Sequence, residues 1–116
     1  MHNFKELHVW QISVELATEI YQLTKSYPKN EMYGLTSQIR RCSVSVSSNI
    51  AEGAGRSGSG EFRHFLTIAY GSSFELETQL IISNNLSYVD QAKFEFLIEK
   101  IVEIQKMLYK LIKSIK

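Results

Sequence analysis

Residues 90–115 carry a hydrophobic repeat whose spacing suits an α-helix and excludes a strand of comparable length. Apolar side chains return every three or four positions, which places them on a single helix face. Each large aliphatic side chain that is buried contributes roughly 1.5–3 kcal/mol to stability. We therefore predict a core-forming helix over residues 90–115. One apolar heptad position is occupied by Phe94, Ile101, Leu108 and Ile115, and the other is occupied by Leu97, Ile104 and Leu111.

Three interruptions divide the remaining sequence into segments with the same helical spacing. Pro28 is the only proline, glycines gather between Gly53 and Gly60, and Asn84 and Asn85 form the third break. Proline disfavours a helical conformation at the preceding residue, and glycine and asparagine are typical of connections. Apolar residues recur with helical spacing between the breaks. The predicted helices span residues 6–27, 34–53, 60–84 and 90–115.

Four amphipathic helices with short connections predict an all-α fold, an antiparallel up-down-up-down four-helix bundle. A length of 116 residues fits a single domain over residues 1–116. The segment Ser43–Ser47 alternates with period two, but helical spacing continues through it, so we predict helix there as well. Gly71 falls within the third helix, where glycine costs about 1 kcal/mol relative to alanine. This cost predicts close backbone packing at Gly71-Ser72-Ser73.

Composition narrows the classes of function. Charged residues make up 22% of the chain and the formal net charge is +1, which argues against a purely electrostatic nucleic-acid binder but leaves a local basic patch open. Cys42 is the only cysteine, which excludes an intrachain disulfide and fits a reducing compartment. No apolar run approaches the roughly 20 residues of a membrane span, and no secretory signal is apparent. We expect a cytoplasmic protein with no membrane partner.

No pattern of residues indicates catalysis. His2, His8 and His64 are scattered without metal-ligand spacing, and no base is placed beside a serine by local spacing. The glycine-rich stretch Gly53–Gly60 lacks the Gly-Lys-Ser/Thr sequence of a phosphate-binding loop. We predict a protein that is not an enzyme, with no catalytic residues, metal or cofactor. A site assembled from distant helices is the alternative.

Residues 34–56 carry a specific pattern. It reads Gly-Leu-Thr-Ser-Gln-Ile-Arg-Arg over residues 34–41 and Ser-Val-Ser-Ser-Asn-Ile-Ala-Glu-Gly over residues 45–53, followed by Arg56. The pattern resembles the four-helix bundle proteins encoded in intervening sequences of bacterial 23S rRNA genes, and further matches cover nearly the whole chain. The sequence departs from the family at Ser47, where proline is common.

This resemblance implies an assembly and a set of partners. The family forms ring-like homopentamers and is similar to the accessory variability proteins of diversity-generating retroelements. Those proteins bind nucleic acid and a reverse transcriptase. The resemblance therefore implies that the chain binds further copies of itself, RNA or DNA, and a nucleic-acid enzyme. It assigns no biochemical function.

Polar residues of the second and third predicted helices form the candidate binding surface. One hypothesis is that arginines contact phosphates, because the guanidinium fork matches phosphate oxygens; the candidates are Arg40, Arg41, Arg56 and Arg63. The alternative is a structural network in which Arg40 or Arg41 pairs with a carboxylate of Glu52, Glu75 or Glu77, or in which the polar stripe holds subunits together. The residues of that stripe are Ser45, Asn49, Glu52 and Glu75.

The first and third predicted helices carry more apolar residues than one core-facing stripe requires. Surplus apolar surface on a helix is typical of a protein interface. The candidate interface residues are Trp10, Tyr21, Phe74 and Ile81. A wide core stripe within one chain is the alternative.

Overall fold

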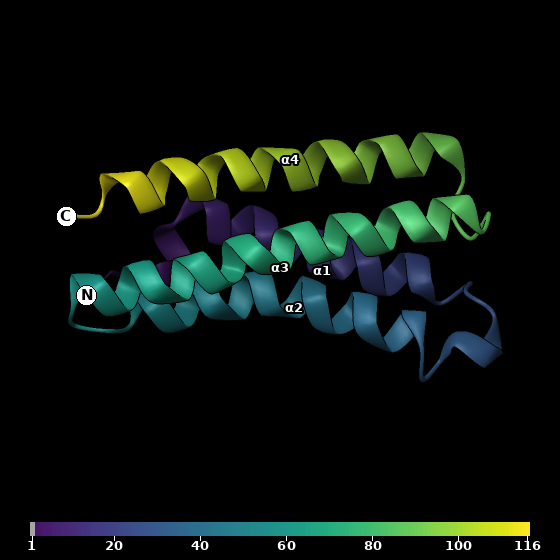
Figure 1. Ribbon diagram of the computed structural model, residues 1–116, viewed down its shortest axis with the longest axis horizontal. Coiled ribbons are helices and arrows are strands. Elements are labelled where there is room, and N and C mark those ends of the chain that lie inside the picture. The colour runs from purple at the N-terminus through teal and green to yellow at the C-terminus, as the bar shows by residue number, and fades with distance from the viewer. Residues whose placement is uncertain (1) are drawn as a thin grey trace.

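The computed structural model describes residues 2–116 and consists of four long helices (Figure 1). Short 3₁₀ turns at Phe4–Glu6 and Lys29–Glu31 precede the first two helices. No strand occurs within residues 2–116, and Ser43–Ser47 is helical as predicted. The predicted all-α class is therefore confirmed by the four helices, which are α1 (His8–Thr24), α2 (Leu35–Ala54), α3 (Ser59–Asn85) and α4 (Gln91–Ser114).

Consecutive helices run in opposite directions around a shared core (Figure 1). The His2 N–H donates to the Ala54 carbonyl at 2.8 Å, which joins the start of the described chain to the end of α2. Toward the other end of the bundle, Lys93 in the first turn of α4 pairs with Glu19 of α1. Contacts join α1 to α2, α2 to α3, α3 to α4, and α4 back to α1. The predicted four-helix bundle is present, with up-down-up-down topology.

The helix bounds match the predicted ones to within one residue, except in α1. This helix was predicted over residues 6–27 but covers only His8–Thr24. Pro28 disfavours helix at Tyr27, and the last amides tighten into turns in which Tyr27 N–H donates to Thr24 O at 3.1 Å. At the other end, Leu7 is extended and follows the separate 3₁₀ turn.

The core is a layer of aliphatic side chains contributed by all four helices. Of the predicted heptad, Phe94 and Leu111 lie toward the ends of α4 and Ile115 directly follows the helix, and all three are only partly buried. The middle of the same heptad is inaccessible to solvent, together with isoleucine and leucine side chains from the other three helices. The largest fully buried side chains are Ile20, Ile39, Ile50, Leu66, Leu76, Leu80, Leu97, Ile101, Ile104 and Leu108.

Small residues allow α2 and α3 to pack closely. A Cβ atom at Gly53 would lie 2.8 Å from the Cβ of Phe65 and 3.2 Å from the carbonyl oxygen of Phe62. Ser43 is buried and its hydroxyl donates to the Arg40 carbonyl at 2.8 Å, so the polar atom is satisfied within its own helix. Because serine and valine are weak helix formers, packing against neighbouring helices holds α2 in its helical form.

The prediction of close packing over Gly71-Ser72-Ser73 is wrong at Gly71 within this chain. A Cβ atom at this position would meet nothing within 4 Å. The adjacent Ser72 and Ser73 are buried, but Gly71 itself points out of the bundle. Sequence spacing alone did not distinguish the inward from the outward side of α3 at this point.

Glu31 joins the two connections at one end of the bundle. Its Oε1 accepts the Leu35 N–H at 3.2 Å and thereby satisfies an amide of the first turn of α2. Its Oε2 accepts the Tyr88 hydroxyl at 3.0 Å, and the Tyr88 ring packs 5.1 Å from that of Tyr27. The α1–α2 and α3–α4 connections are thus fastened together by one carboxylate and two aromatic rings.

The contact at Gly53 generates a first prediction. Gly53→Ala should lower the free energy of unfolding by about 1–3 kcal/mol, because the added methyl group overpacks the α2–α3 interface. Urea denaturation followed by circular dichroism, at a fixed protein concentration, measures the change. Gly60→Ala is the matched control, since a Cβ there would meet nothing within 4 Å. Equal effects of the two substitutions would contradict close packing at Gly53.

The tyrosine pair generates a second prediction, on alkaline stability. Burial raises the pKa of Tyr27 above the ordinary 10.0, and the hydrogen bond to Glu31 raises the pKa of Tyr88. As the pH rises past 10, the unfolded chain releases these protons while the folded chain retains them, so stability falls. The Tyr27→Phe Tyr88→Phe variant should lose less stability over this interval than the unsubstituted protein, as measured by urea denaturation across pH. If both proteins lost the same stability over this interval, the two tyrosines would not be the cause of the alkaline destabilisation.

Candidate nucleic-acid interface

The four candidate arginines do not form one patch. Arg40 and Arg41 lie near the start of α2, whereas Arg56 follows α2 and Arg63 lies near the start of α3. Along a helix that rises 1.5 Å per residue, Arg41 and Arg56 are separated by about 22 Å. The structure therefore divides the predicted set into one pair at each end of α2.

Arg56 and Arg63 make contacts within their own chain. The Arg56 guanidinium lies 3.4 Å from the Glu52 carboxylate and 3.7 Å from that of Glu61. It also lies over the Phe65 ring, 5.1 Å from the ring centroid. Arg63 donates to the backbone carbonyl of Ile115. Two carboxylates offset the positive charge of Arg56, which weakens the attraction that it offers to a phosphate.

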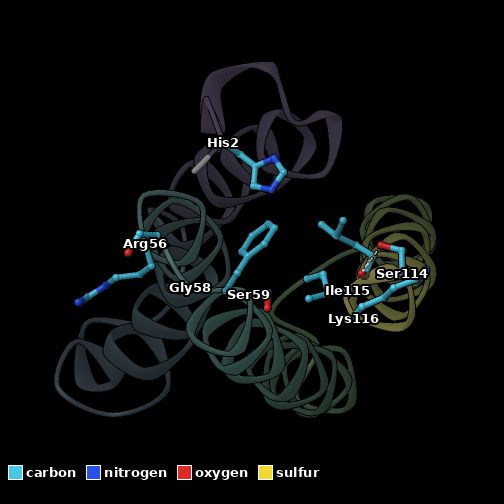
Figure 2. A pocket seen from close by; sticks show the side chains of 10 residues that line it. His2, Arg56, Gly58, Ser59, Ser114, Ile115 and Lys116 are labelled. Atoms are coloured by element: carbon cyan, nitrogen blue, oxygen red, sulfur yellow. Dashed lines mark hydrogen bonds between the residues drawn. The ribbon is translucent and has the colours of Figure 1, made fainter.

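A cleft of about 430 Å³ opens beside Arg56, at the bundle end that holds the start and the end of the described chain (Figure 2). The His2 ring points into this cleft and packs 4.8 Å from the ring of Phe62. The Arg56 side chain points away from it (Figure 2). This cleft thus does not gather the predicted arginines, although Arg56 lies at its edge.

Arg40 is held across the α1–α2 interface. Its Nε donates to the Thr24 hydroxyl at 2.7 Å, and its Nη2 lies 3.5 Å from the Tyr21 carbonyl oxygen. The guanidinium carbon lies 4.8 Å from the centroid of the Tyr21 ring. Arginine has five N–H donors, so donors remain after these two contacts. The guanidinium is oriented in advance for a further acceptor.

Neither Arg40 nor Arg41 forms an ion pair with any residue of the described chain. Arg41 is exposed on α2. The carboxylates that were considered as their partners are engaged elsewhere: Glu75 Oε2 lies 3.7 Å from Cys42 Sγ, and Glu77 accepts from Gln105 Nε2 at 2.8 Å. The hypothesis that a carboxylate neutralises these arginines is therefore not supported.

The adjacent arginines line a second cleft, of about 460 Å³, along α1, the start of α2 and the connection between them. The start of α2 and the α1–α2 connection, which supply most of its lining residues, lie at the bundle end opposite the two ends of the described chain (Figure 1). No carboxylate lines the cleft, so the positive charge faces it uncompensated by a lining residue. The lining residues are Tyr21, Met32, Tyr33, Thr36, Ser37, Arg40, Arg41 and Val44.

Two residues of this α1–α2 cleft were not singled out as binding residues by the sequence analysis. The Tyr33 side chain is 93% exposed, and the Thr36 hydroxyl is buried without a hydrogen-bond partner in the described chain. Thr36 belongs to the pattern over residues 34–41, and Tyr33 directly precedes that pattern. The spacing of four residues on α2 places Thr36 on the same helix face as Arg40 and could have indicated it, but Tyr33 precedes the helix and has no such signal.

The predicted polar stripe is largely a network within the chain. Asn49 Nδ2 donates to the Ser45 carbonyl at 2.8 Å and lies 3.0 Å from the Ser45 hydroxyl. That hydroxyl lies 2.9 Å from the Ser72 hydroxyl of α3. Burial, with the nearby Glu75 carboxylate, raises the pKa of the Cys42 thiol, which keeps it protonated and a poor nucleophile. These contacts join α2 to α3.

The predicted interface residues have different surroundings. Trp10 is partly buried and packs edge-on against Phe4 at 5.0 Å, so part of its surface is used within the chain. The Tyr21 ring is 42% exposed and lies beneath Arg40. On α3, Phe74 is 44% exposed and Ile81 is 41% exposed. The strongest candidates for an interface are therefore on α3.

Within residues 2–116, no three His, Cys, Asp or Glu side chains are grouped so that they could hold a metal ion. None of the helices in this same part of the chain combines the length and apolar character needed to cross a membrane.

Comparison with known proteins identifies a similar solved structure and a matching protein family. A solved structure of a protein of unknown function from the S23 ribosomal protein family of Bacteroides thetaiotaomicron superimposes with a TM-score of 0.85. The two are 27% identical, over 91% of this chain and 96% of that one. No curated protein sequence matches the chain. The profile of the 23S rRNA-intervening sequence protein family matches residues 5–110. The chain belongs to the 23S rRNA-intervening sequence protein family.

Proposed function

We propose that the protein is a non-enzymatic, homo-oligomeric helical bundle that binds RNA through the α1–α2 cleft. The observation that carries this proposal is the pair Arg40 and Arg41, which line a cleft without a carboxylate and form no ion pair in the described chain. Guanidinium groups in that setting bind phosphate with two parallel hydrogen bonds.

A local patch of this kind is needed because the whole chain has a net charge of only +1. Most of the affinity of a protein for RNA comes from phosphate contacts, each of which releases counterions. Two arginines per chain supply few such contacts. Several copies in one assembly multiply them, because the second and later contacts become intramolecular. RNA binding and assembly are therefore proposed together.

Two features of α3 support assembly. Phe74 and Ile81 remain more than one-third exposed. Phe74 also lines an apolar groove of about 380 Å³ between α3 and α4, together with Tyr70 and Tyr109. Gly71 costs helix stability but relieves no clash within its own chain. A neighbouring subunit that approaches α3 closely would account for this glycine. The homopentamer implied by the family resemblance is the form that we propose.

The second candidate is a purely structural assembly protein whose ring is its function. The same exposed residues on α3 favour it. In that case the arginines have only a structural role, as Arg40 already has in joining α2 to α1. Of the predicted polar stripe, Glu52 remains more available to a neighbouring subunit than Ser45 and Asn49, because its side chain is 54% exposed.

RNA binding is tested by fluorescence anisotropy of a labelled RNA that contains single-stranded loops, at several salt concentrations. Arg40→Gln Arg41→Gln should weaken binding and reduce the slope of log affinity against log salt by about one per arginine lost. Arg56→Gln Arg63→Gln is the matched control, with the same change in charge at the other end of α2. The control should bind nearly as tightly as the unsubstituted protein.

Two results would contradict this proposal in different ways. If the unsubstituted protein does not bind at low salt, the assembly-only function is favoured. If the control loses as much affinity as the first variant, all four arginines contact phosphate, as the sequence analysis first suggested, and the α1–α2 cleft is not the particular site. Circular dichroism establishes that each variant remains folded.

Assembly is tested by light scattering coupled to size-exclusion chromatography. Phe74→Glu and Gly71→Leu should each shift the protein from an oligomer, expected to have five times the chain mass, toward the monomer. The first places a charge and the second a bulky side chain at the proposed subunit contact. Phe96→Glu is the control, since Phe96 is similarly exposed, at 43%, but lies on α4. A monomeric unsubstituted protein would reject the assembly.

A further inference from the structure

The α1–α2 cleft combines a site for a phosphate with an aromatic ring that lies open to solvent. Tyr33 is 93% exposed, the highest value among the large hydrophobic side chains of residues 2–116 that remain exposed. It lies on the same cleft as Arg40 and Arg41. A tyrosine ring in this position offers a flat surface on which a nucleic-acid base can stack.

The backbone that carries Tyr33 is fixed on both sides. The Gly34 N–H donates to the Glu31 carbonyl at 2.9 Å, and the Glu31 carboxylate accepts the Leu35 N–H. The same carboxylate is bonded to Tyr88 of the α3–α4 connection. The exposed ring is therefore attached to a well-anchored turn, which reduces the entropy lost when a base stacks on it.

The wall of the cleft contains a polar group that lacks a partner. The Thr36 side chain is 94% buried, since its exposed fraction is 6%, and its hydroxyl makes no hydrogen bond within the described chain. That oxygen has almost no accessible surface, so a ligand in the cleft reaches it only if the Thr36 side chain moves. Ser37 lines the cleft next to it and is partly exposed, and its hydroxyl can donate to or accept from a base edge or a sugar hydroxyl.

We infer that this cleft binds an unstacked nucleotide of single-stranded nucleic acid, with its phosphate on Arg40 and Arg41 and its base on Tyr33. The inference rests on the proposed function and specifies the form of the nucleic acid. A duplex keeps its bases stacked inside and presents mainly phosphate and sugar at its surface. It would engage the arginines but leave Tyr33 without a stacking partner.

The test compares a single-stranded twelve-nucleotide RNA, labelled with fluorescein, with the same strand annealed to its complement. The single strand should bind at least tenfold more tightly. Tyr33→Ala should lower affinity for the single strand by about 5- to 150-fold, while the slope with salt stays unchanged because no charge is lost. Tyr33→Phe should retain the affinity. A DNA strand of the same sequence shows whether the bound nucleotide must belong to RNA or can also belong to DNA.

Phe96→Ala is the matched control, because Phe96 is also an exposed aromatic residue, at 43%, but lies on α4, outside both the α1–α2 cleft and the α3–α4 groove. This variant should bind the single strand as the unsubstituted protein does. Because Tyr33 makes little contact with the rest of the chain, its removal should leave the circular dichroism spectrum and the melting temperature unchanged. Photocrosslinking of 5-iodouridine RNA, followed by mass spectrometry, should identify Tyr33 as the modified residue.

The outcomes separate this inference from the proposed function. If duplex and single strand bind equally and Tyr33→Ala has no effect, while Arg40→Gln Arg41→Gln still weakens binding, RNA binding stands and the single-strand inference is overturned. If the unsubstituted protein binds neither RNA, both fail. Equal binding of RNA and DNA strands supports the inference and assigns recognition to the phosphate and the base alone.

Discussion

The close packing of α2 against α3 is the constraint on which the rest of the structure depends. The sequence of α2 is rich in serine and valine, which favour a helix only weakly, and two of its serines, Ser43 and Ser47, are buried. Its stability comes from the aliphatic core and from the contact at Gly53, where no side chain fits between the helices. Because Thr36, Arg40 and Arg41 all belong to α2, the proposed binding cleft exists only while these contacts hold the helix.

The four arginines show why total charge says little about a binding surface. Arg56 lies between two carboxylates, and exposed pairs of this kind contribute only about 0–1 kcal/mol to stability. Their larger effect is on the local potential, which they reduce. Arg40 and Arg41 have no such partner in the described chain, so a protein with a net charge of +1 still offers concentrated positive charge at one cleft.

The cleft also depends on segments that are distant in sequence. Arg40 is oriented by Thr24 and Tyr21 of α1, and the turn that carries Tyr33 is anchored by Glu31, which in turn is bonded to Tyr88. The connection between α3 and α4 therefore helps to position a site on α1 and α2. A ring of subunits built through α3 would leave this site at another face of each bundle, so the proposed binding and assembly surfaces do not compete for the same residues.

The sequence by itself determined the all-α class, three of the four helices to within one residue at each end, and the middle of the core, including Leu97 and Ile104. These follow from hydrophobic periodicity, which is a local property of the chain. Tertiary structure alone decided that Gly71 faces outward, that Arg40 is held by Thr24 and Tyr21 of α1, and that Tyr33 shares a cleft with Arg40. Each of these depends on how helices are rotated and placed relative to one another, and spacing along a single helix contains no measure of the distance to the next.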